Sequence, residues 1–100
     1  MPKRVYLGTR DLLFRSKLGA VVVAAGAEVA REEAGCDLAV LELGAPDAIG
    51  RIGGLLEKGI PVLAYGSHVR ADLLRAAREA GAVAVPNSEV ERRLLGFLNT

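Results

Sequence analysis

The sequence predicts an α/β fold in three layers, with a five-stranded parallel sheet between two layers of helices. Five short apolar runs are separated by longer segments in which apolar residues recur at helical spacing. The third run, "DLAVLEL" at 37–43, is apolar at nearly every position, which is typical of a strand covered on both faces. Strands that alternate with helices form parallel sheets through right-handed crossovers.

The first strand is predicted at 4–8, where "RVYLG" combines β-branched and aromatic residues before a glycine. A helix is predicted over about 11–25, with Thr9 as its N-cap and Gly26 just after its end. The apolar stripe of this helix consists of Phe14, Leu18, Val21, Val22 and Ala25. The alternative is a strand in "AVVVAA" at 20–25, because three consecutive valines favour that state.

The other four strands are predicted at 27–31, 37–43, 60–65 and 82–85. The later helices are predicted to begin at Pro46 or Asp47 and end at Gly59, to occupy 69–80, and to occupy 89–98. Their inner faces are expected to carry Ile49, Ile52, Leu55, Leu56, Leu73, Leu74, Ala77, Val90, Leu94 and Phe97. The three glycines of "GRIGG" weaken the first of these helices, and we expect them to permit close packing on the sheet.

Composition narrows the class of protein. One hundred residues make a single domain, and a formal charge of +1 lacks the basic excess of a nucleic-acid-binding protein. The apolar runs are too short to span a bilayer and no signal peptide is evident, so we expect a cytoplasmic protein.

The single cysteine, Cys36, predicts neither a disulfide nor a zinc cluster and is expected to be a buried small hydrophobe. The absence of Gln and the excess of Arg over Lys fit a thermophilic source or a biased genome composition.

Over nearly the whole chain, the element order and several strings resemble response-regulator receiver domains. "CDLAVLELG" looks like the receiver strand that ends in the phosphorylated aspartate, with Glu42 at that position. "IPVLAYGSH" is similar to the fourth strand, where receivers place Thr or Ser and this chain has Gly66 followed by Ser67. "LLRAAREAGAVAVPNSE" resembles the helix and strand that follow, with Asn87 in place of the receiver lysine. The resemblance implies a flavodoxin-like sheet in the order 2-1-3-4-5.

The departures from the receiver pattern fall together at one corner. Receivers hold Mg²⁺ with two acids after the first strand, whereas this chain has Thr9 and Arg10, with Asp11 one step late. Glu42 is one methylene longer than aspartate, and Gly66 has no hydroxyl. "DLLFRSKL" and "YGSHV" also look like receiver-like proteins that lack the phosphorylation residues. The resemblance therefore implies a non-catalytic module that binds protein partners, without Mg²⁺, another cofactor or phosphorylation.

Glu42 at the end of the central strand would lie in the crevice of an open parallel sheet. We expect it either to pair with Arg10 or to face solvent, and a bound ligand is a third option. The candidate crevice for a partner, or for an anion or nucleotide in a small-ligand sensor, is lined by Thr9, Arg10, Asp11, Glu42, Ser67, His68 and Asn87. Ser67 and His68 could form a nucleophile pair, but no third member is evident, so capping of the next helix is the expected role and no enzyme is predicted.

The connection between the second and third strands is too short for a full helix. Only "EEAGC" at 32–36 joins them, so one face of the sheet should lose part of its cover. Exposed apolar sheet marks association, which predicts a homodimer that covers the gap. If "AVVVAA" were the strand, "AEVAREEAG" at 27–35 would supply the missing helix instead.

Overall fold

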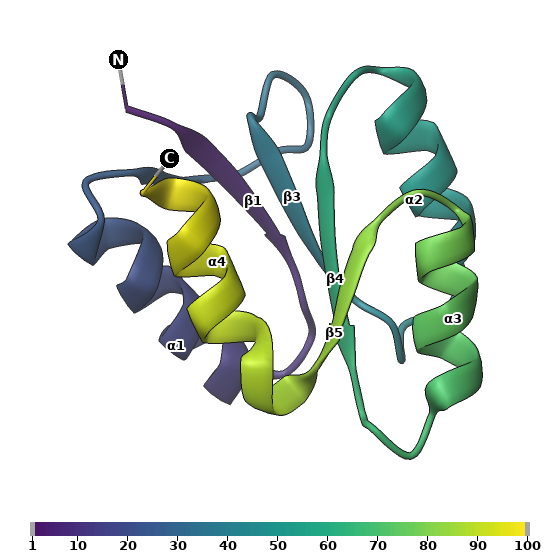
Figure 1. Ribbon diagram of the computed structural model, residues 1–100. Coiled ribbons are helices and arrows are strands. Elements are labelled where there is room, and N and C mark those ends of the chain that lie inside the picture. Colours follow the sequence, from purple (N-terminus) through teal and green to yellow (C-terminus); the bar gives the residue numbers. More distant parts are fainter. Residues whose placement is uncertain (1, 100) are drawn as a thin grey trace.

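The computed structural model describes residues 2–99 as a parallel sheet with helices on both faces (Figure 1). The order of the five strands is β2-β1-β3-β4-β5, which confirms the predicted topology. The strands are β1 (Arg4–Gly8), β2 (Glu28–Ala30), β3 (Leu38–Glu42), β4 (Val62–Gly66) and β5 (Val83–Pro86). All four pairings are parallel, so the carboxyl ends of the strands share one edge of the sheet.

Four α-helices form the two outer layers. They are α1 (Leu12–Ala24), α2 (Ala48–Glu57), α3 (Ala71–Glu79) and α4 (Val90–Leu98), and a 3₁₀ turn, η1 (Asn87–Glu89), precedes α4. α1 and α4 cover one face of the sheet, and α2 and α3 cover the other (Figure 1). Each face therefore has its own apolar core, and β3 and β4 are buried on both sides. No helix within residues 2–99 is long and apolar enough to cross a membrane.

The valine-rich segment is helical, as the apolar stripe predicted. Leu18 and Val22, four residues apart, are fully buried, whereas Val23 is exposed, which is the periodicity of a helix with one buried face. The N-cap is Asp11, however, and the expectation of Thr9 was wrong. Asp11 Oδ1 accepts hydrogen bonds from the amides of Leu13 (2.9 Å) and Phe14 (3.2 Å), while the hydroxyl of Thr9 is directed elsewhere.

No helix forms between β2 and β3, as the short link predicted. Nevertheless, within residues 2–99 the sheet face covered by α2 and α3 does not show the expected stretch of exposed apolar sheet. Ala30 is buried and Tyr6 is half-buried, with the guanidinium of Arg51 5.9 Å above the Tyr6 ring. Arg51 is held there by an ion pair with Glu33 of the link. The Arg51 guanidinium and the link between β2 and β3 therefore cover the part of the sheet that the missing helix would have covered.

The glycines of α2 do not serve close packing, which corrects the expectation from "GRIGG". A Cβ atom at Gly50, Gly53 or Gly54 would meet open space. The helix instead approaches the sheet through Ile52 and Leu55, which are buried.

Candidate functional site

The Glu42 carboxylate is fixed by hydrogen bonds from the chain that leaves β1. Its Oε1 atom accepts from Thr9 Oγ1 at 2.7 Å, from the Arg10 amide at 3.2 Å and from the Asp11 amide at 3.4 Å. β1 and β3 are adjacent, with Gly8 opposite Leu41, so the chain turns away from β1 directly beside Glu42. The turn that starts α1 thus supplies its donors to this carboxylate.

The predicted ion pair between Arg10 and Glu42 is wrong. Arg10 contributes its backbone amide and not its guanidinium, and its side chain is exposed in a separate pocket. The predicted alternative of a freely solvated Glu42 is also wrong, because the residue is partly buried and has three donors on one oxygen. Backbone amides can stabilise the Glu42 carboxylate in place of a guanidinium, because a carboxylate accepts several hydrogen bonds without a full positive charge nearby.

Tyr65 completes the network, and the sequence reasoning missed it. Its hydroxyl donates to Thr9 Oγ1, which in turn donates to Glu42, so the three side chains form a relay. Tyr65 is 2% exposed, and its ring lies 5.1 Å from that of Phe14. Burial raises the pKa of Tyr65 to about 12, against the lowering effect of the Thr9 hydrogen bond. The signal was present: Tyr65 is two residues after the buried Leu63, and a buried tyrosine hydroxyl needs a partner.

A pocket of about 150 Å³ opens above this relay at the carboxyl edge of the sheet. Four of the predicted crevice residues line it, namely Asp11, Glu42, Ser67 and Asn87. Thr9 is buried and, with Arg10, lines a different pocket, and His68 is not among the lining residues of this one. The pocket is lined by two carboxylates and by no basic side chain.

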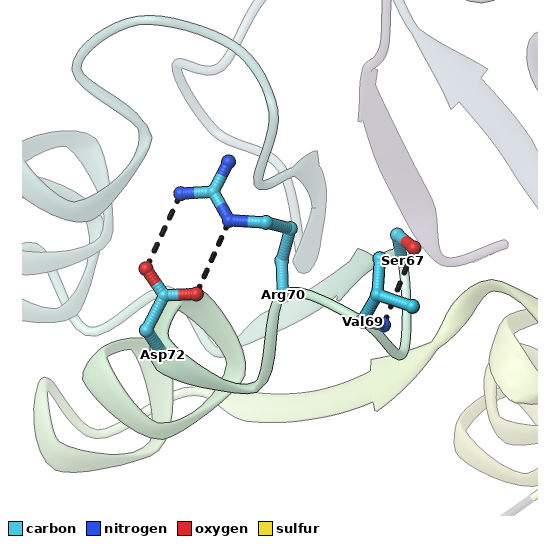
Figure 2. Close-up of polar contacts among 4 residues, drawn as sticks. All are labelled: Ser67, Val69, Arg70 and Asp72. Carbon is cyan, nitrogen blue, oxygen red and sulfur yellow. Dashed lines mark hydrogen bonds and ion pairs between the residues drawn. The ribbon is translucent and has the colours of Figure 1, made fainter.

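Ser67 and His68 do not cap α3, and the structure corrects that expectation. The helix begins at Ala71 with Arg70 in the N-cap position, so both residues lie in the preceding loop. Ser67 Oγ accepts from the Val69 amide at 3.4 Å, and Arg70 pairs with Asp72 through two contacts of 3.2 Å (Figure 2). This exposed pair lowers the pKa of Asp72 chiefly through the Arg70 hydrogen bond.

Two glycines at the rim are closely approached by their neighbours. A Cβ atom at Gly8 would lie 2.7 Å from Leu41 Cδ2 and 3.3 Å from the Val40 carbonyl oxygen. A Cβ atom at Gly66 would lie 3.3 Å from Leu43 Cβ. Larger side chains would therefore force Leu41, at Gly8, or Leu43 just after β3, at Gly66, to shift. Within residues 2–99, no three His, Cys, Asp or Glu side chains lie together as a metal-binding group.

No protein-family model matches this sequence, and no curated protein matches it. Solved structures do match the fold. A BeF3-activated DrrB receiver domain superposes with a TM-score of 0.83 at 16% identity, over 99% of this chain and 96% of that one. A CheY-like receiver domain protein from Methanospirillum hungatei gives 0.80 at 16% identity, over 99% and 92%. A putative response regulator from Chloroflexus aurantiacus gives 0.79 at 20% identity, over the whole of both chains. The chain thus has the fold of response-regulator receiver domains.

Proposed function

We propose that the chain is a receiver-like signalling module that acts by binding protein partners and is not phosphorylated at Glu42. The observation that carries the proposal is the state of the Glu42 carboxylate. One oxygen is held by the Thr9 hydroxyl and two amides, and Asp11, the other acid that lines this pocket, caps α1 through its Oδ1 atom. Phosphoryl transfer needs a metal ion to neutralise the developing charge. Each of these two carboxylates already uses one oxygen for hydrogen bonds within the chain.

Packing supports the same proposal at two positions. β1 ends at Gly8, where an added Cβ atom would lie 2.7 Å from Leu41 Cδ2, so the Leu41 side chain would have to shift to admit an acidic side chain. At the end of β4, Gly66 stands where the receiver resemblance places a hydroxyl, and Leu43 crowds any Cβ there. Restoring the receiver chemistry would therefore require the side chains of Leu41 and Leu43 to shift as well as substitution of the rim residues.

The test is treatment of the full chain with acetyl phosphate and Mg²⁺, followed by intact mass measurement. We expect no phosphoryl adduct on the wild-type chain, while a functional receiver domain in a parallel reaction is labelled. The matched variant is Glu42→Gln, which keeps the side-chain shape and removes the nucleophilic oxygen. An adduct on the wild type that is missing from Glu42→Gln would refute the proposal.

We also propose that one partner is a second copy of this chain. The gap beside β2 is not the apolar surface first expected, so the contact belongs elsewhere. Val23 on α1 and Leu95 on α4 are 67% and 43% exposed, and these two helices are neighbours on one face of the sheet. A symmetric contact through this layer would bury both apolar side chains.

The alternative role, a sensor that binds an anion or nucleotide in the Glu42 crevice, has less support. Asp11 and Glu42 both line that pocket, and like charges would repel an anionic ligand. Arg10, the residue expected to hold the anion, lines a different pocket.

A further inference from the structure

A second pocket, of about 240 Å³, lies on the other side of the β1–α1 turn from the Glu42 pocket. Tyr6 of β1 and Ala30 of β2 are among its lining residues, and α1 and α2 contribute others. In a chain with a helix between β2 and β3, that helix would pass over this region. The short link at 31–37 therefore leaves the pocket open.

Four arginines line this pocket, and no acidic side chain does. Arg10 lies in the turn between β1 and α1, and Arg15 lies near the start of α1. Arg31 follows β2, and Arg51 belongs to α2. The chain has 13 basic and 12 acidic residues, so such a one-sided cluster is a local feature that the net charge of +1 conceals.

Only one of the four arginines is neutralised within the described chain. Arg51 forms an ion pair with Glu33 and lies over the Tyr6 ring, which fixes its position at the wall of the pocket. No acidic group of residues 2–99 pairs with Arg10, Arg15 or Arg31. Three like charges at one concave site repel one another and attract a counter-anion, and a concave wall strengthens this attraction.

We propose that this pocket binds a small phosphate-bearing anion, with Arg10, Arg15 and Arg31 as its direct contacts. The planar guanidinium group matches two phosphate oxygens at once, which makes arginine the preferred residue for this chemistry. The site goes beyond the interaction role proposed above and does not depend on it.

The size of the pocket limits the ligand. Its volume of about 240 Å³ is below the range of roughly 300–1,000 Å³ that is typical of pockets for drug-sized molecules. Phosphate, diphosphate or the phosphate end of a larger metabolite fits this space. The remainder of such a metabolite would extend into solvent.

The experiment is calorimetric titration of the full chain with inorganic diphosphate at constant ionic strength. We expect saturable binding that Arg15→Gln or Arg31→Gln weakens roughly tenfold or more, because each removes hydrogen bonds to a charged group. The matched controls are Arg75→Gln and Arg93→Gln, which remove the same charge from exposed positions of α3 and α4 outside the pocket. Both controls should bind diphosphate as the wild type does.

Further probes identify the source of the phosphate group and the selectivity. Orthophosphate and a nucleoside diphosphate are compared with diphosphate, and acetate at matched ionic strength is the anion expected not to bind. Failure of every phosphate-bearing probe to bind would overturn the proposal. Equal losses in Arg31→Gln and Arg75→Gln, or equal binding of acetate and diphosphate, would overturn it too, since either result indicates general charge attraction.

Discussion

The relay from Tyr65 through Thr9 to Glu42 shows how single residues decide the chemistry of the sheet edge. Thr9 is buried and uses its hydroxyl twice, as acceptor from Tyr65 and as donor to Glu42. One oxygen of a carboxylate at the end of a buried strand thereby receives a hydroxyl and two backbone amides, and no arginine guanidinium of residues 2–99 pairs with it. The negative charge of Glu42 therefore remains at the rim of the sheet, where it disfavours anionic ligands in the Glu42 pocket.

The raised pKa of Tyr65 gives a prediction about stability in alkali. The pKa of Tyr65 is near 10 in the unfolded chain and about 12 in the folded chain. The contribution of this residue to the free energy of unfolding is therefore complete below pH 10, where the tyrosine is neutral in both states. The free energy of unfolding should therefore fall as the pH rises from 10 to 12, by about 2–3 kcal/mol from this residue. Urea unfolding at pH 9 and at several values up to pH 12 measures the fall.

The variant Tyr65→Phe keeps the ring against Phe14 and removes the ionising group. It should lose less stability than the wild type over the same pH window. Effects of other titrating groups are common to both proteins and cancel in the comparison. Parallel curves for the two proteins would show that the hydroxyl of Tyr65 does not control this loss.

Residue roles were harder to predict from the sequence than residue positions. Glu42 was placed correctly at the end of the central strand, but its partners are residues 9–11, some 30 positions away in the chain. Both Thr9 and Asp11 are good N-cap residues, and only the turn beside β3 decides that Thr9 binds Glu42 while Asp11 caps α1. Local patterns carry no information about such long-range competition.

At the level of elements, the periodic patterns were reliable and the loops were not. The stripe of α1 outweighed the strand preference of its three valines, because Leu18 and Val22 bury the helix on the sheet. Strand boundaries shifted by one or two residues, as at β4, which was predicted to end at Tyr65 and ends at Gly66. The start of α3 was predicted too early because "GSHV" contains residues that often precede helices.

The open surroundings of the α2 glycines give a prediction about stability. Gly54 lies on the exposed side of the helix with nothing within 4 Å of an added Cβ atom. Gly54→Ala should raise the free energy of unfolding by about 0.5–1 kcal/mol, because alanine loses less backbone entropy in a helix. Urea denaturation of the two proteins checks the size and sign.

The matched control is Gly59→Ala, just after the same helix. Gly59 has a φ of +78°, a conformation that alanine adopts only with strain. This variant should be less stable than the wild type. If Gly54→Ala were also destabilising, the outer face of α2 would have to pack against something, contrary to the open space around it.

For the whole molecule, the fold could be predicted and the charge distribution could not. Alternation of strands and helices predicted the layers, and the receiver resemblance implied the strand order that the structure shows. The arginine pocket had no signal, because residues 10, 15, 31 and 51 have no motif spacing and meet only through the topology. The link between β2 and β3 was recognised as short, but its consequence was expected to be an apolar gap.

The proposed self-association is tested by the mass of the molecule in solution. We expect a species of twice the 10.5 kDa chain mass at high concentration in sedimentation or light scattering. Val23→Lys should shift it toward monomer, because a charge would replace an exposed apolar contact on α1. Val69→Lys, an equally exposed position in the β4–α3 loop, is the control that should leave the mass unchanged. A single-chain mass for the wild type at every concentration would contradict the homodimer.

The outermost strands of the sheet are both very short. β2 offers three residues and begins with the charged Glu28, and β5 offers four and ends at Pro86, whose nitrogen carries no hydrogen. A foreign strand that tried to extend the sheet would find few backbone donors and acceptors on either side. The short edge strands thus protect the molecule against amyloid-like stacking, even though its central strands are almost wholly apolar.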